Sequence, residues 1–234
     1  MDISSVIDQV LLGDSAELLR ELPDACVEAV VTDPPFGIGF LYNKPEDHST
    51  PEEYWAWLAP IHEQIDRVLK PGGFLAIWQA QKNYRYLWTW FGADIHIYAA
   101  CRNFTQLRRT PFNYAYDPVV MRYKGGGVPL RPADPPRNCD FYVGNTARYV
   151  SQTEAIAREH PCPRPLDAVE EILRNFALPG AIVLDPFLGS GTTAVACVNT
   201  GRRYIGIEKH SDYHGVALRR LRQTHSDFFA FGSE

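Results

Sequence analysis

The chain has 234 residues, of which 45% are hydrophobic, and this composition is typical of one globular domain. A formal net charge of −5 excludes a protein that coats nucleic acid by bulk electrostatics, and no apolar run approaches the length of a membrane span. The five scattered cysteines form no Cys-x-x-Cys pair and the start of the chain lacks a basic signal region, so we expect a cytoplasmic protein with reduced thiols and no metal site.

Strand and helix patterns alternate along the chain. A first short strand ends at the turn Gly13-Asp14, and a helical pattern with apolar residues at positions 16, 18, 19 and 22 follows it. A valine-rich strand then ends at Asp33, and a helix over 51–70 is expected to stop at the sequence Pro-Gly-Gly, residues 71–73. Further strands are expected at 73–78, 94–104, 118–123, 180–187 and 202–208, and further helices at 84–92, 165–178, 189–200 and 211–223.

This alternation predicts an α/β fold with a doubly wound, mostly parallel, Rossmann-like sheet. We expect residues 1–234 to form one catalytic domain. The pattern weakens between about 102 and 159, where prolines and the sequence KGGG at 124–127 interrupt it. We therefore expect a loop-rich insertion there.

Basic residues gather in this insertion. Residues 101–150 carry eight Arg or Lys against three Asp, which gives +5 there and leaves −10 for the rest of the chain. We expect Arg108, Arg109, Arg122 and Lys124 to contact phosphates of a nucleic acid. The competing interpretation is a solvated basic surface that binds nothing.

A glycine turn joins a strand to a helix in the stretch VLDPFLGSGTTAVAC, residues 183–197. Gly189 and Gly191 let the backbone pass close to a ligand, and the amides that open the helix favour polar or anionic groups. Glu208 ends the next strand, 23 residues after Asp185, where a carboxylate can accept both hydroxyls of a ribose. Because the turn matches neither a dinucleotide fingerprint nor a P-loop, we expect a nucleoside that carries a group smaller than a pyrophosphate.

The stretch EAVVTDPPF, residues 28–36, places a carboxylate, two prolines and an aromatic ring at the end of a strand. The prolines lack N–H donors and fix the chain, so a rigid carbonyl and the Asp33 carboxylate can accept together from one exocyclic NH₂ group. Phe36, which we expect to be exposed, can stack on the planar group that carries this amine. The pattern favours an aminated nucleobase as the substrate, against the alternative of an ordinary proline-rich turn.

The order of these two motifs resembles a known family. DPPF at 33–36, followed by DPFLGSGTT at 185–193, is similar to the β group of amino-methylating DNA methyltransferases, which use S-adenosylmethionine. HPCPRP at 160–165 is similar to the family's segment that closes over the methionine end of the cofactor, with arginine where lysine is usual. The resemblance implies catalytic roles for Asp33, Pro34, Pro35 and Phe36, and cofactor contacts from Asp14, Arg164, Asp185, Pro186, Phe187, Gly189, Ser190, Gly191, Thr192 and Glu208.

The same resemblance implies methylation of the N6 amine of adenine in a specific site of double-stranded DNA, after the base has flipped out of the duplex. Cytosine-N4 methylation is the nearest rival, although that subgroup often has Ser in place of Asp33. A protein-glutamine methyltransferase, whose motif usually opens with Asn, and a non-catalytic binding module are further alternatives. A bacterial or phage origin, a role in restriction–modification and a homodimer are compatible with the β group.

Overall fold

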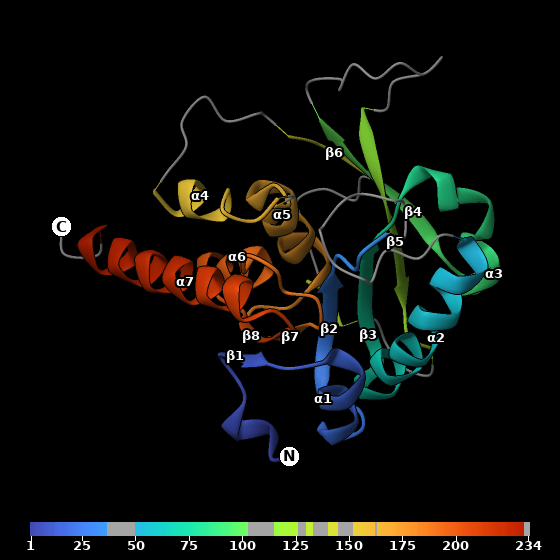
Figure 1. Cartoon of the computed structure of the whole chain (residues 1–234), viewed down its shortest axis with the longest axis horizontal. Coiled ribbons are helices and arrows are strands. Elements are labelled where there is room, and N and C mark those ends of the chain that lie inside the picture. The colour runs from blue at the N-terminus through green and yellow to red at the C-terminus, as the bar shows by residue number, and fades with distance from the viewer. Residues whose placement is uncertain are drawn as a thin grey trace.

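The computed structural model describes residues 1–36, 50–102, 115–125, 130–132, 140–144, 152–161 and 163–231. These residues form an eight-stranded sheet with the strand order β1-β8-β7-β2-β3-β5-β4-β6 (Figure 1). The strands are β1 (Gln9–Leu12), β2 (Val27–Thr32), β3 (Leu69–Trp78), β4 (His96–Arg102), β5 (Tyr116–Tyr123), β6 (Phe141–Gly144), β7 (Ile182–Asp185) and β8 (Arg203–Glu208).

The sheet is mostly parallel. Strands β1, β8, β7, β2 and β3 run parallel to one another, β5 is antiparallel to β3 and to β4, and β6 is parallel to β4. The predicted doubly wound α/β fold is therefore confirmed.

The chain changes winding direction between β7 and β2, which are neighbours in the sheet. From β7 it continues through α6 (Thr192–Thr200) to β8 on one side, and from β2 through α2 (Pro51–Val68) to β3 on the other. In such sheets the crevice at the carboxyl ends of these two central strands binds ligands. The two strands end at Thr32 and Asp185, next to the two motifs of the sequence.

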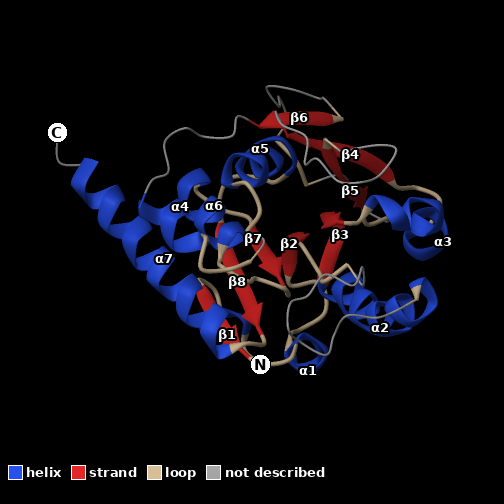
Figure 2. Cartoon of the chain, turned by 45° about the horizontal axis from the view of Figure 1, so that its top comes forward, coloured by secondary structure: helices blue, strands red, loops and turns tan. Residues whose placement is uncertain are grey.

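Helices cover both faces of the sheet (Figures 1 and 2). Buried side chains of α1 (Ser15–Glu21), α2 and α3 (Leu87–Phe91) form one apolar core with the sheet, and those of α5 (Leu166–Phe176), α6 and α7 (Ser211–Phe231) form the other. Strand β2 lies between the two layers, and its consecutive residues Val30 and Val31 are buried in opposite cores. The remaining elements are η1 (Ile3–Ser5), η2 (Gln81–Tyr86) and α4 (Gln152–Ala157), which packs against α7.

Helix α2 is shorter than predicted. It begins with a capping box between Thr50 and Glu53 and ends at Val68, and β3 already starts at Leu69. The expected Pro-Gly-Gly stop signal lies inside this strand, where the Gly72 amide donates to the Lys124 carbonyl at 2.9 Å. Pairing with the loop after β5 therefore overrides the local tendency of these residues to form a turn.

The region expected to be an insertion contributes to the central sheet. β5 lies within the range 102–159 and pairs with β3 from Phe74 to Trp78. The strand expected at 118–123 is therefore confirmed, and it is a partly buried strand of the sheet. The role of the other parts of this range in target recognition stays a prediction, and much of it lies outside the described residues. Within the described part of the chain, no helix is long and apolar enough to cross a membrane.

Candidate active site

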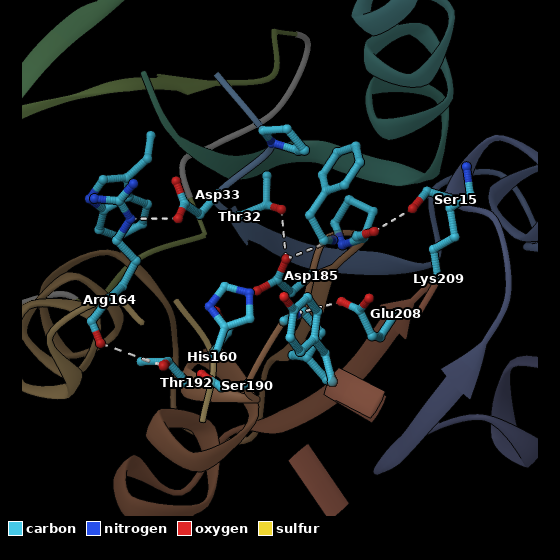
Figure 3. A pocket seen from close by; sticks show the side chains of 18 of the residues that line it. Ser15, Thr32, Asp33, His160, Arg164, Asp185, Ser190, Thr192, Glu208 and Lys209 are labelled. Carbon is cyan, nitrogen blue, oxygen red and sulfur yellow. Dashed lines mark hydrogen bonds and ion pairs between the residues drawn. The ribbon is translucent and has the colours of Figure 1, made fainter. Parts of the chain in front are cut away.

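A pocket opens at the carboxyl ends of the central strands, where both sequence motifs meet (Figure 3). Loops after β1, β2, β7 and β8 and the segment before α5 form its walls. Of the predicted site residues, it is lined by Asp14, Asp33, Pro35, Arg164, Asp185, Pro186, Phe187, Gly189, Ser190, Thr192 and Glu208. The pocket therefore brings together predicted residues from both motifs and from three further segments, which carry Asp14, Arg164 and Glu208.

The glycine turn after β7 forms the floor of the pocket. Gly189 has φ +56° and Gly191 has φ +86°, which are left-handed conformations that side chains rarely adopt. A Cβ atom at Gly191 would lie 3.0 Å from the Cβ of Ala217, and one at Gly189 would lie 3.2 Å from Nε2 of His160. The turn thus needs glycine for its backbone, and at Gly191 also for close packing against α7.

Glu208 is buried at the end of β8, with 6% of its surface exposed. Its Oε2 accepts from the Gly189 amide and its Oε1 from the His210 amide, each at 2.8 Å. An ionised carboxylate has about four acceptor positions, so further positions remain after these two bonds. The carboxylate is held rigidly in the wall of the pocket and can still accept the hydroxyls of a ribose.

Asp14 and Lys209 form a second polar group at the same end of the pocket. Asp14 caps α1 by accepting from the Ala16 amide at 2.8 Å. Its other oxygen lies 3.3 Å from Nζ of Lys209. Ser15, the next residue, donates to the Pro186 carbonyl and so ties α1 to the glycine turn.

Asp185 ends β7 in a buried position, with 4% of its surface exposed. Its Oδ1 accepts from the Thr32 hydroxyl at 2.6 Å and from the Phe187 amide at 3.0 Å. Burial raises the pKa of Asp185 to about 6, and the nearby charge of Asp33 raises it slightly, whereas the hydrogen bonds from Thr193, Thr32 and Phe187 lower it. The pocket therefore holds two carboxyl groups at the ends of adjacent strands.

Asp33 is held by an arginine on one oxygen only. Nε of Arg164 donates to Oδ2 of Asp33 at 2.5 Å. Oδ1 of Asp33 is buried and has no hydrogen-bond partner among the residues that the structure describes. Burial raises the pKa of this carboxyl group, the Arg164 guanidinium lowers it, and the charge of Asp117 raises it. An unpartnered carboxylate oxygen next to a pocket is a ready acceptor for an N–H donor.

Phe36 does not present the free ring that its sequence predicts. It is only 9% exposed, and the guanidinium carbon of Arg164 lies 5.0 Å from the centre of its ring. The expectation of an exposed ring is therefore wrong, because the apolar core and Arg164 cover it. Its backbone carbonyl accepts from Nδ2 of Asn83 at 3.4 Å, which fastens the turn after Asp33 to η2. Phe36, Pro34 and Gly191 do not line the pocket, and stacking of Phe36 on a base stays a prediction.

Of the four residues that were predicted to contact DNA, the structure describes two. Arg108 and Arg109 lie outside the described residues. Arg122 pairs with Asp66 of α2 at 2.5 Å, and Nζ of Lys124 donates to the carbonyls of Asp66 and Leu69. These intramolecular contacts give both residues a structural role, and their contact with DNA stays a prediction.

Several pocket residues escaped the sequence analysis. Trp57 comes from α2 and packs against Phe187 with 5.6 Å between ring centres. His160 opens the HPCPRP segment, and its ring lies 4.4 Å from that of Tyr213 in α7. The motif letters of HPCPRP could have indicated His160. Trp57 and Tyr213 sit in amphipathic helices, and nothing in their local sequence separates them from core residues.

A mostly parallel sheet with a glycine turn and two strand-end carboxylates at its switch point defines a Rossmann-like methyltransferase fold. A family model described as DNA methylase, of the N6 and N4 type, matches residues 27–219. The chain therefore belongs to this family of DNA methylases.

Individual relatives agree with this membership. The type II methyltransferase M.BglII of Bacillus subtilis is 28% identical over an alignment of 255 positions, gaps included. The alignment covers 92% of this chain and 69% of that protein. The DNA adenine methyltransferase YhdJ of Escherichia coli is 26% identical over 243 residues, with 91% and 82% covered. The structure of the PvuII DNA methyltransferase, which is cytosine-N4-specific, superimposes with a TM-score of 0.73 at 20% identity, covering 91% of this chain and 85% of that one.

Proposed function

We propose that this chain methylates the N6 amine of adenine in a specific site of double-stranded DNA, with S-adenosylmethionine as the methyl donor. The observation that supports this proposal most directly is the unpartnered Oδ1 of Asp33, which lies beside a pocket that suits a nucleoside. Family membership supports DNA as the substrate. A solved structure with a TM-score of 0.70 is a complex of M1.HpyAVI with the same cofactor, which supports the choice of donor.

The pocket has the groups that this cofactor requires. The rigid carboxylate of Glu208 suits the ribose hydroxyls, and the glycine turn after Asp185 gives the backbone room to pass along the ligand. Asp185 can accept from the cofactor's ammonium group. When bound, S-adenosylmethionine supplies a methyl group activated by its sulfonium, whose sulfur keeps the electron pair of the broken C–S bond.

The residues of the chain would act on the target amine. An amine of this kind is a poor nucleophile because its lone pair is delocalised into the ring. By accepting one N–H, Oδ1 of Asp33 orients the nitrogen and stabilises the positive charge that develops on it. The Pro34 carbonyl is the predicted acceptor for the second N–H. After the new C–N bond has formed, one N–H proton leaves the nitrogen for water.

Adenine is favoured over cytosine by two observations. The motif opens with Asp33, whereas the cytosine-N4 subgroup of the family often has Ser at this position. One relative with similar coverage is named a DNA adenine methyltransferase. The fold itself does not distinguish the two bases, since a cytosine-N4-specific enzyme shares it.

Expression in a host that lacks DNA methylation tests the proposal. Sequencing that detects modified bases should find N6-methyladenine at one recurring site, and none with an Asp33→Ala variant. N4-methylcytosine at a recurring site would support the rival base with the same chemistry. If the host DNA stays unmodified although the wild-type protein is well folded, and if this protein also binds no cofactor, the enzymatic function is contradicted.

A further inference from the structure

Arg164 lies between the carboxylate of Asp33, in the turn after β2, and that of Asp117, in β5. Its Nε donates to Oδ2 of Asp33 at 2.5 Å, and its Nη1 donates to Oδ2 of Asp117 at 2.8 Å. The Arg164 side chain is only 10% exposed. We propose that Asp117 is a positioning residue for methyl transfer: it holds Arg164, and Arg164 holds Asp33 with Oδ1 left for the target amine. This inference rests on the proposed function and names a residue that no motif indicated.

Asp117 is anchored more firmly than the carboxylate that it serves. It belongs to β5, where it pairs with Ala100 of β4 inside the sheet. Asp33 follows the last residue of β2 and belongs to a turn rather than to a strand. A side chain on a strand defines a position better than one on a loop. The path from Asp117 through Arg164 therefore transfers the rigidity of the sheet to the turn that carries Asp33.

Two further contacts fix the arginine between its carboxylates. The guanidinium lies over the ring of Phe36, 5.0 Å from its centre. The Arg164 carbonyl accepts from the hydroxyl of Thr192 at 3.5 Å, in the first turn of α6. The clamp formed by Asp33, Arg164 and Asp117 thus connects the catalytic turn with the glycine turn of the proposed cofactor site.

The charges of the clamp favour the same function. Two carboxylates share one guanidinium, so the formal charges of ionised Asp33, ionised Asp117 and Arg164 add up to −1 within these three side chains. With Arg164 alone, the charge of Asp33 would be neutralised and would attract the developing positive charge less strongly. Asp117 compensates part of the arginine's charge, and Arg164 can therefore orient Asp33 without cancelling its negative potential.

Arginine suits this arrangement better than the lysine that is usual in the family. A guanidinium carries its donors on separate, coplanar nitrogens, and here Nε and Nη1 each serve a different carboxylate. A lysine offers all its donors from one nitrogen on a flexible stem. We expect Arg164→Lys to keep part of the clamp and Arg164→Gln to lose it.

The test compares Asp117→Asn with the wild-type protein in single-turnover methyl transfer to DNA that contains the modified site. Asn keeps the shape of the side chain and removes its charge. We expect the transfer rate to fall about 10-fold or more, while the dissociation constants for S-adenosylmethionine and for DNA change less than twofold. Asp24→Asn is the matched control, because Asp24 also pairs across elements, with Arg67, but lies outside the pocket.

The arginine variants keep the proposal testable if Asp117→Asn folds poorly. The expected order of transfer rates is wild type, then Arg164→Lys, then Arg164→Gln, with cofactor affinity nearly constant for the lysine variant. An unchanged rate in Asp117→Asn would overturn the proposal. A rate that falls only in proportion to lost cofactor affinity or lost folded protein would also overturn it, since Asp117 would then be purely structural.

A second measurement needs neither cofactor nor DNA. The carboxyl group of Asp33 is followed by NMR during a pH titration of the ligand-free protein. The Asp33 carboxyl group interacts electrostatically with four groups: Arg164 from the segment before α5, Asp117 from β5, Asp185 from β7 and Tyr54 from α2. Removing the charge of Asp117 should lower the pKa of Asp33, and Arg164→Gln should raise it. Unchanged titration in both variants refutes the clamp, whereas absent methyl transfer by the wild type refutes only the proposed function.

Discussion

The hydroxyl of Thr32 donates to Oδ1 of Asp185 across 2.6 Å, and this bond joins the last residues of the two central strands. The turn that carries Asp33, the proposed catalytic residue, begins immediately after Thr32, and the glycine turn begins immediately after Asp185. The two sites of the proposed reaction are therefore held together through the sheet. The same bond stabilises the charged form of a carboxyl group that burial makes costly to ionise.

This burial leads to a prediction about stability and pH. The pKa of folded Asp185 is raised to about 6 from its ordinary value of 3.8. The group therefore favours the folded state below pH 3.8, and this contribution is lost as the pH rises through 6. Asp185→Asn should thus gain stability relative to wild type on going from pH 4 to pH 8, by up to about 3 kcal/mol.

Urea unfolding of the ligand-free proteins at the two pH values measures this gain. The exposed Asp94 provides the control, since Asp94→Asn should show no comparable change. The variant should bind S-adenosylmethionine more weakly even where it is more stable. A gain in stability that is the same at pH 4 and pH 8 would contradict the buried, ionisable state of Asp185.

Glu208 should determine cofactor affinity. Glu208→Ala removes the proposed charged acceptor for the ribose, which is also the acceptor of the amides of Gly189 and His210. We expect affinity for S-adenosylmethionine to fall by about 2–3 kcal/mol, and Glu208→Gln to lose less because it keeps one acceptor oxygen. Titration calorimetry measures both, with exposed Glu63→Ala of α2 as the control. Wild-type affinity in a folded Glu208→Ala protein would exclude the ribose contact.

The basic residues should separate into two groups. Lys124→Met removes donors from the carbonyls of Asp66 and Leu69, so the free energy of unfolding should fall by about 1–3 kcal/mol. The slope of log K for DNA binding against log salt should be the same for Lys124→Met as for the wild type. Arg109→Gln should instead lower the slope of log K against log salt by about 1 and leave stability unchanged.

Fluorescence anisotropy with duplexes of unrelated sequence, at several salt concentrations, measures these slopes. If Lys124→Met lowers the slope by about 1, Lys124 contacts phosphate in the complex and its intramolecular bonds open on binding. If Arg109→Gln has no effect on any duplex, the basic surface is solvated and the phosphate assignment for Arg109 fails.

What could be predicted from the sequence follows from how local each feature is. The strand that ends at Thr32, one residue before Asp33, and the glycine turn after Asp185 are contiguous patterns, and both lie close to where they were expected. The pairing of Arg164 with Asp117 joins residues 47 positions apart, and only the fold brings them together. No spacing rule or residue preference marks such a pair, because an Asp inside a strand pattern has no local signature.

The errors have the same origin. Phe36 was expected to be exposed because it follows two prolines in a turn, but tertiary packing places Arg164 over its ring. The helix expected over 51–70 was expected to stop at the sequence Pro-Gly-Gly, but it ends at Val68 and β3 begins at Leu69. The pairing of β3 with β5 is decided by a neighbour that lies far away in sequence. Local preferences indicate turns, whereas long-range contacts decide what covers them.

The last prediction separates the roles of Asp33 and Phe36. Asp33→Ala removes the oxygen that holds and polarises the target amine, so single-turnover methyl transfer should fall by roughly 100-fold or more. Cofactor affinity should change little, because Glu208 and the glycine turn remain. Phe36→Leu keeps most of the buried apolar volume and removes the aromatic face, so it should leave stability within about 1.5 kcal/mol of wild type.

Phe36→Leu then distinguishes two roles of the ring. If Phe36 supports Arg164, the variant should reduce the transfer rate, with little change in the affinity for DNA that carries an abasic site opposite the target. If it stacks on the flipped base, the affinity for normal duplex should fall by about 1–3 kcal/mol. Quench-flow transfer assays and anisotropy titrations on the same preparations give both quantities. A near wild-type rate for Asp33→Ala would refute the catalytic assignment of the DPPF motif, whichever role Phe36 has.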